Sequence, residues 1–247
     1  MGLIKKEVGK TLWLLTHHTP LKSHIYSLFL RAKTPAFMSL KKASLLIIGI
    51  LIIDQVSKFY IKTNFQLGES VPVFDWFKIL FVENRGMAWG AEIPGEYGKT
   101  ILTAFRLVAI VAIGYWLWDS IRKNGSRVLV AAIALIFAGA MGNIIDSVFY
   151  GELFSGSYGQ VAEFLPAEGG YSSWFHGHVV DMLYFPIWEG ILPEWLPIWG
   201  GKEFTFFEPV FNIADTSISI GVGLLIVFHK KAFPKEETSG KLNEKAE

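Results

Sequence analysis

The sequence predicts a membrane protein that is mainly α-helical, with four transmembrane helices, a small β-sheet and long loops on one side of the bilayer. Hydrophobic residues make up 51% of the 247 residues and charged residues only 18%, and the mean hydropathy is +0.37. This balance is typical of a membrane protein rather than of a soluble domain. Four stretches are also long and apolar enough to cross a bilayer, which takes about 20 residues.

The four predicted spans cover residues 43–61, 100–118, 128–149 and 212–229. The last of them lies within FNIADTSISIGVGLLIVFHKK, where Asp215 stands near the start of an otherwise apolar helix. A carboxylate in hydrocarbon costs about 3 kcal/mol on insertion scales, so this aspartate requires a reason. Between the first two spans, residues 71–90 contain alternating and aromatic runs, which predict the small outer sheet.

The distribution of Lys and Arg, which prefer the cytoplasmic side of a membrane, predicts the orientation. Residues 1–42 carry eight Lys or Arg and one Glu, and residues 119–127 carry three more basic residues between the second and third spans. Residues 150–211, in contrast, hold one Lys among many acids. We therefore expect both termini in the cytoplasm, and residues 62–98 and 150–211 on the outer side.

The chain divides into three expected parts. Residues 38–232 form the membrane domain, and residues 233–247 form a polar cytoplasmic tail. Residues 1–37 are basic and weakly amphipathic, which fits either an optional extension or a helix that lies on the membrane surface.

Composition excludes several functions. The net charge of +1 gives no basis for nucleic-acid binding. The absence of cysteine excludes disulfides, thiolate zinc sites and a cysteine nucleophile.

Polar residues lie at a common depth in three of the spans. Asp54 is in the outer half of the first span, Asn143 and Asp146 are near the outer end of the third, and Asn212 and Asp215 open the fourth. A simpler interpretation of the fourth span is that Asn212 or Asp215 caps the helix or favours its positive end. Agreement among three spans instead favours a bundle interior or a water-filled cavity, where intramembrane acids usually lie.

One further acid, Asp181, stands in an apolar run of the outer loop, in HGHVVDMLYFPIW. This run fits either a strand or a helix that dips to the membrane surface. Two carboxylates a few ångströms apart share one proton, because both do not ionise easily. Such a pair activates a water molecule, one acid acting as base and the other as proton donor, without metal, thiol or serine.

Five short segments, in order, resemble the lipoprotein signal peptidases, the type II signal peptidases of bacteria. They are DQVSK (54–58), NRGMAWG (84–90), GNIID (142–146), VVD (179–181) and FNIAD (211–215). The resemblance implies an aspartic intramembrane endopeptidase that cleaves a prolipoprotein just before its lipid-modified cysteine. It covers about residues 38 to 232.

The resemblance implies a role for each motif residue. The catalytic pair falls on Asp181 and Asp215, a choice that depth alone does not make. The remaining motif residues bind substrate or support the pair: Asp54, Lys58, Asn84, Gly86, Gly90, Asn143, Asp146 and Asn212.

The resemblance also implies partners and a location. The substrate is a diacylglyceryl-modified prolipoprotein, which arrives with its acyl chains still among the membrane lipids. The enzyme is expected to be a monomer in the bacterial inner membrane, with its active site facing the periplasm and without a metal or other cofactor.

Two departures from the family pattern stand out. The third motif usually continues with Arg, and here Ser147 follows Asp146; Arg106, in the outer half of the second span, is a candidate substitute. The loops at residues 150–177 and 188–206 are longer than is usual in the family, and we expect them to have a structural or gating role.

Two alternatives come from other functional classes. His176 and His178 are two residues apart and share one face of a strand, so with Asp181 they would suit a metal-dependent hydrolase. A small ion-coupled transporter would also use outer acids, but the inner halves of the spans offer no continuing polar path.

Overall fold

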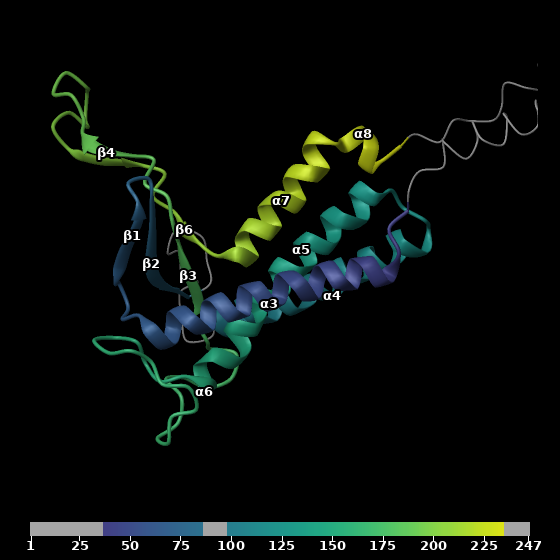
Figure 1. The fold of residues 1–247 in the computed structure, drawn as a ribbon, viewed down its shortest axis with the longest axis horizontal. Coiled ribbons are helices and arrows are strands. Elements are labelled where there is room, and N and C mark those ends of the chain that lie inside the picture. Colours follow the sequence, from purple (N-terminus) through teal and green to yellow (C-terminus); the bar gives the residue numbers. More distant parts are fainter. Residues whose placement is uncertain (1–36, 86–97, 235–247) are drawn as a thin grey trace, which may run out of the picture. The chain divides into compact units, whose positions relative to one another are not determined.

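The computed structural model describes residues 37–85 and 98–234 of the chain (Figure 1). The helices are α3 (Leu40–Asn64), α4 (Gly98–Arg122), α5 (Arg127–Ile145), the π-helix η2 (Asp146–Tyr150), α6 (Gly151–Leu153), α7 (Ile213–Val227) and α8 (His229–Ala232). The strands are β1 (Ser70–Phe74), β2 (Phe77–Asn84), β3 (Val179–Tyr184), β4 (Trp188–Ile191), β5 (Glu203–Phe206) and β6 (Val210–Phe211). Predictions for residues 1–36, for Gly86 and Gly90, and for residues 235–247 lie outside the described residues.

Three helices are long and apolar enough to cross a membrane, and they correspond to the first three predicted spans. They cover Leu40–Asn64, Thr100–Arg122 and Arg127–Leu153. The fourth predicted span coincides with α7, an apolar helix of 15 residues. It ends at Val227, and the short helix α8 follows after Phe228.

Helix α5 packs against α3, α4 and α7 (Figure 1). Glycine permits the closest of these approaches. A Cβ atom at Gly139 would lie 2.2 Å from the carbonyl oxygen of Ala214 on α7, and one at Gly142 would lie 2.6 Å from Oδ2 of Asp54 on α3. A larger residue at Gly139 would meet the backbone of α7 and push this helix away, whereas one at Gly142 would displace the Asp54 carboxylate.

The larger sheet is antiparallel, with strand order β1-β2-β3-β6. The prediction of a sheet in residues 71–90 is confirmed for β1 and β2. Asp181, for which the sequence left strand and helix open, lies on the central strand β3. Strand β6 leads through Asn212 directly into α7, so the sheet and the helices meet at this residue.

Three of the helices that hold the site begin at a capped residue. At the start of α3 the Ser39 hydroxyl accepts a hydrogen bond from the backbone N–H of Lys42 at 3.4 Å. The Ser126 hydroxyl accepts a hydrogen bond from the backbone N–H of Leu129 at 3.2 Å at the start of α5. The Asn212 side-chain oxygen accepts one from the N–H of Asp215 at 2.8 Å at the start of α7. Ser and Asn are favoured at this position because their oxygens satisfy an amide that the helix leaves unpaired.

The two long loops differ in structure. Residues 188–206 contain the β4–β5 hairpin. Residues 151–177 are mostly irregular, and part of this loop runs along η2. There the N–H groups of Phe175 and Gly177 donate to the carbonyl oxygens of Val148 and Ser147, at 3.0 and 2.9 Å. The π-helix thus has hydrogen-bond partners outside its own helix. Such π-type turns within helices occur frequently at functional sites.

Candidate active site

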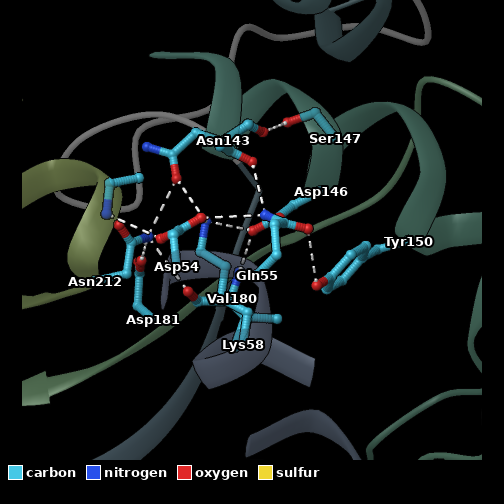
Figure 2. A network of polar contacts seen from close by, with 12 residues as sticks. Asp54, Gln55, Lys58, Asn143, Asp146, Ser147, Tyr150, Val180, Asp181 and Asn212 are labelled. Atoms are coloured by element: carbon cyan, nitrogen blue, oxygen red, sulfur yellow. Dashed lines mark hydrogen bonds and ion pairs between the residues drawn. The ribbon is translucent and has the colours of Figure 1, made fainter. Parts of the chain in front are cut away.

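All eight predicted site residues that the structure describes lie in one hydrogen-bonded network, at the end of the helices next to the sheet. Figure 2 shows most of this network. Its members come from α3, β2, α5, η2, β3, the β6–α7 junction and α7: Asp54, Lys58, Asn84, Asn143, Asp146, Asp181, Asn212 and Asp215.

Asp181 is buried, with 2% of its surface exposed. Its Oδ1 accepts a hydrogen bond from the Asn212 side-chain amide at 2.7 Å. Its Oδ2 accepts one from the Asn84 amide at 3.2 Å. Both carboxylate oxygens are therefore held by neutral amide donors.

Asp215 lies in the first turn of α7 and is tied to Asp181 through Asn212. Its Oδ1 accepts a hydrogen bond from the Asn143 amide at 2.7 Å, and its backbone N–H donates to the Asn212 side chain that caps the helix. Asn212 thus donates to one aspartate and accepts from the other. Asn212 therefore caps this helix, as the capping interpretation predicts. The Asp215 carboxylate instead accepts its hydrogen bond from Asn143 and belongs to the site.

The environment of Asp181 favours its protonated form. Burial, together with the negative charge of Asp215, raises the pKa of Asp181 to about 7, although the hydrogen bond from Asn84 opposes the shift. A carboxyl group with this pKa can hold a proton near neutral pH. A protonated acid beside a second carboxylate is the arrangement that water-activating aspartate pairs require.

Lys58 forms ion pairs with the other two aspartates of the network, Asp54 and Asp146. Its ammonium group is fully buried and forms ion pairs with Asp54 Oδ2 at 3.0 Å and Asp146 Oδ2 at 2.8 Å. It also donates to the Asn143 side-chain oxygen at 2.9 Å. Asp54 and Asp146 therefore share one buried cation.

Asp54 and Asp146 each hold the backbone next to one member of that pair. Asp54 Oδ1 accepts from the N–H of Ala214 at 2.9 Å, one residue before Asp215. Asp146 Oδ2 accepts from the N–H of Val180 at 3.2 Å, one residue before Asp181. The ion-paired acids on α3 and η2 therefore position the start of α7 and the central strand.

Sequence reasoning missed Gln55 as a site residue. Its side-chain amide donates to Asp54 Oδ2 at 3.1 Å, to the Gly142 carbonyl at 3.2 Å and to Asp146 Oδ1 at 2.9 Å. The Tyr150 hydroxyl donates to the Gln55 oxygen at 3.3 Å (Figure 2). The available signal was a second polar residue directly after Asp54 in an apolar span.

Arg106 of α4 reaches the residue that departs from the family pattern. Its guanidinium donates to the Ser147 hydroxyl at 3.1 Å, and Ser147 in turn donates to the Asn143 carbonyl at 2.9 Å. Arg106 also interacts electrostatically with Asp215, Asp146 and Asp181. This position supports its interpretation as a substitute for the cation absent at position 147.

The two histidines that the sequence offered as metal ligands have partners of other kinds. His178 Nδ1 lies 3.0 Å from Glu83 Oε2, and His176 Nδ1 lies 3.1 Å from the Ser173 hydroxyl. Among the residues that the structure describes, no three His, Asp or Glu side chains are grouped so that they could hold a metal ion. The side-chain arrangement therefore does not support the metal-dependent alternative.

Apolar membrane-length helices that end at two amide-bound carboxylates, one of them buried, define a class, the membrane-embedded hydrolases that work by acid–base chemistry. Comparison with known proteins gives the family. Residues 46–230 match the family described as signal peptidase (SPase) II, and the chain belongs to this family.

Similar proteins agree with this assignment. A lipoprotein signal peptidase of Porphyromonas gingivalis is 50% identical over 192 residues, which cover 77% of this chain and 84% of the relative. One of Amoebophilus asiaticus is 38% identical over 181 residues, 72% of each chain. A solved structure described as a bacterial membrane enzyme is 26% identical, with a TM-score of 0.55, and covers 83% of this chain and 98% of its own.

Family membership confirms the resemblance found in the sequence. The chain is a membrane hydrolase of the family that processes prolipoproteins. It is therefore not the ion-coupled transporter that the sequence left open.

Proposed function

We propose that this enzyme removes the signal peptide from diacylglyceryl-modified prolipoproteins, with a water molecule activated between Asp181 and Asp215. One observation supports this choice of residues above the others. Asn212 joins Asp181 to Asp215, whereas Lys58 pairs with both of the remaining aspartates in the network.

The proposed reaction needs one ionised and one protonated aspartate. The ionised carboxylate takes a proton from water, and the resulting hydroxide attacks the carbonyl carbon that precedes the lipid-modified cysteine. The protonated aspartate donates to the carbonyl oxygen as the tetrahedral intermediate forms. When the C–N bond breaks, the first aspartate gives the leaving amine the proton that it took from water. The second aspartate recovers its proton from a hydroxyl of the intermediate, so the pair returns to its starting state.

The neutral amides have two tasks in this proposal. Asn84, Asn143 and Asn212 orient the carboxylates and offer hydrogen bonds to the substrate backbone. An amide suits both tasks because it donates and accepts without carrying charge into a region of low dielectric. One chain supplies the whole described network, which is consistent with a monomer.

The proposal includes a fourth span and an orientation. We place α7, continued by α8, across the bilayer after α3, α4 and α5, with both termini in the cytoplasm of a bacterial cell and the site at the periplasmic surface of the inner membrane. The basic residues that flank these helices support this orientation. The lipid chains of the substrate then remain in the bilayer while its peptide reaches the site.

Labelling of single cysteines tests the orientation, because the chain has no cysteine of its own. Tyr158→Cys, at a position that is 91% exposed, is expected to react with a membrane-impermeant thiol reagent added outside spheroplasts. Lys123→Cys, between α4 and α5, is expected to react only after the membrane is broken. The reverse pattern would contradict the orientation.

A cleavage assay tests the proposed function. Purified enzyme in liposomes is expected to shorten a diacylglyceryl-modified prolipoprotein, with a product that begins at the modified cysteine by mass spectrometry. A metal chelator is expected to leave the rate unchanged. Loss of cleavage with the chelator, restored by added metal, would refute the metal-independent mechanism.

A further inference from the structure

A second buried polar cluster lies on the side of the sheet that faces away from the aspartate pair. Lys62 of α3 forms an ion pair with Glu83 Oε1 of β2. The Ser157 hydroxyl accepts from Lys62 at 2.9 Å and donates to Glu83 Oε1 at 2.9 Å, and His178 Nδ1 lies 3.0 Å from Glu83 Oε2. Three side chains, those of Lys62, Ser157 and His178, thus contact the two carboxylate oxygens of Glu83.

We propose that Glu83 is a positioning residue for the proposed reaction. It anchors the back of strand β2 and thereby holds the Asn84 amide against the carboxylate of Asp181.

The register of β2 and β3 places the two sets of residues on opposite faces. Val82 pairs with Asp181, Glu83 with Val180, and Asn84 with Val179. Because side chains alternate along a strand, Asn84 shares a face with Asp181, and Glu83 points to the other side. A shift of β2 that releases Glu83 would therefore also move Asn84, its neighbour in the chain.

The back of the sheet is packed tightly enough to fix this strand. Phe81 and Val180 are fully buried and Met182 is 2% exposed, in a cluster that includes Ile61 and Phe154. Within this apolar cluster, Lys62 is also fully buried.

Charge makes Glu83 the essential member of the cluster. Burial alone would raise the pKa of Glu83, but the hydrogen bond with His178 and the charge of Lys62 outweigh it and lower the pKa to about 2. The carboxylate is therefore ionised near neutral pH. Without it, the Lys62 ammonium would be left buried without its partner, which is strongly unfavourable.

The cluster also gives the loop at residues 151–177 a structural task. This loop supplies Ser157, as well as Tyr171, whose ring lies 4.7 Å from Lys62 Nζ and whose hydroxyl accepts from the N–H of His178 at 2.6 Å. The loop thus supports β2 and β3 on the face of the sheet opposite the aspartate pair. In this part it is a structural support rather than a lid over the aspartates.

The pH dependence of kcat/KM tests the proposal, because it reports on Asp181 through the Asn84 hydrogen bond. That bond favours the ionised form, so its loss is expected to raise the pKa of Asp181 further. The charged groups that also act on Asp181 are Asp215, Lys58 and Arg106, and the variants leave all three in place.

Glu83→Gln, Asn84→Ala and the double variant are compared with the unchanged enzyme. Each single variant is expected to lower kcat/KM roughly tenfold, mainly through kcat, and to move the alkaline limb of the profile to higher pH. The double variant is expected to show no larger shift than Asn84→Ala alone, because Glu83 acts through Asn84.

Lys78→Gln is the matched control. Lys78 lies on the same strand in a half-exposed ion pair with Glu189 at 3.1 Å, and its loss is expected to leave the profile unchanged. If Glu83→Gln does not fold, Ser157→Ala replaces it, because this variant removes one donor to Glu83 and leaves both charges in place.

The outcomes separate this proposal from the proposed function. A shift with Asn84→Ala but not with the Glu83 or Ser157 variant would overturn the positioning role alone. Additive shifts in the double variant would overturn it as well. If no variant moves the profile, then the assignment of Asp181 to the reaction and the role of Glu83 both fail.

Discussion

Replacing either Asp181 or Asp215 by Asn is expected to lower the rate of prolipoprotein cleavage by about 10⁴-fold, the upper range of general acid–base catalysis. Asparagine keeps the size of aspartate and can still accept one hydrogen bond, from Asn212 at position 181 or from Asn143 at position 215. It cannot take up or release the proton that the reaction moves. The loss should therefore appear in kcat, with substrate binding largely retained.

The assay follows cleavage of the lipid-modified substrate by gel shift and binding by co-purification of uncleaved substrate. Asp119→Asn is the matched control, because Asp119 lies near the end of α4 and forms an ion pair with the exposed Lys123. It should cleave at the rate of the unchanged enzyme. If Asp181→Asn or Asp215→Asn does so too, the assignment of the pair is wrong, and Asp54 and Asp146 become the next candidates.

Lys58→Met is expected to lower the free energy of unfolding by about 3–5 kcal/mol, the range measured when one partner of a buried ion pair is removed. The variant would leave two buried carboxylates, Asp54 and Asp146, without their shared cation. Those carboxylates hold the backbone before Asp215 and before Asp181, so activity should fall as well. Thermal unfolding of the purified protein in detergent measures the change.

Lys123→Met provides the comparison for this variant. Lys123 and Asp119 form the same i,i+4 pair as Lys58 and Asp54, but the Lys123 side chain is 73% exposed. Water solvates exposed charges, so its loss should leave the melting temperature nearly unchanged. Equal melting temperatures for the two lysine variants would show that Lys58 does not stabilise the buried acids.

The sequence predicted those features that depend on local pattern. Apolar runs of sufficient length located α3, α4 and α5, and the alternating residues 71–90 predicted the hairpin of β1 and β2. The common depth of Asp54, Asp146 and Asp215 anticipated that three helices bring their acids together. The motif resemblance then separated the proposed pair from the supporting acids.

Contacts between distant segments could not be predicted in this way. Lys58 on α3 contacts Asn143 and Asp146, which lie 85 and 88 positions further along the chain. Nothing near Lys58 in the sequence specifies them as its partners. The link between Arg106 and Ser147 depends likewise on how α4 packs against α5. Nothing near Glu83 in the sequence specifies Lys62, Ser157 or His178 as its partners, which lie 21, 74 and 95 positions away.

The most direct test of the aspartate pair is the pH dependence of single-turnover cleavage by the unchanged enzyme, measured with chelator present from about pH 5 to about pH 9. If Asp181 must hold a proton for the reaction, the rate should fall on the alkaline side with an apparent pKa of about 7. A rate that instead keeps rising toward alkaline pH, as expected when deprotonation frees the nucleophile, would contradict the shared-proton mechanism.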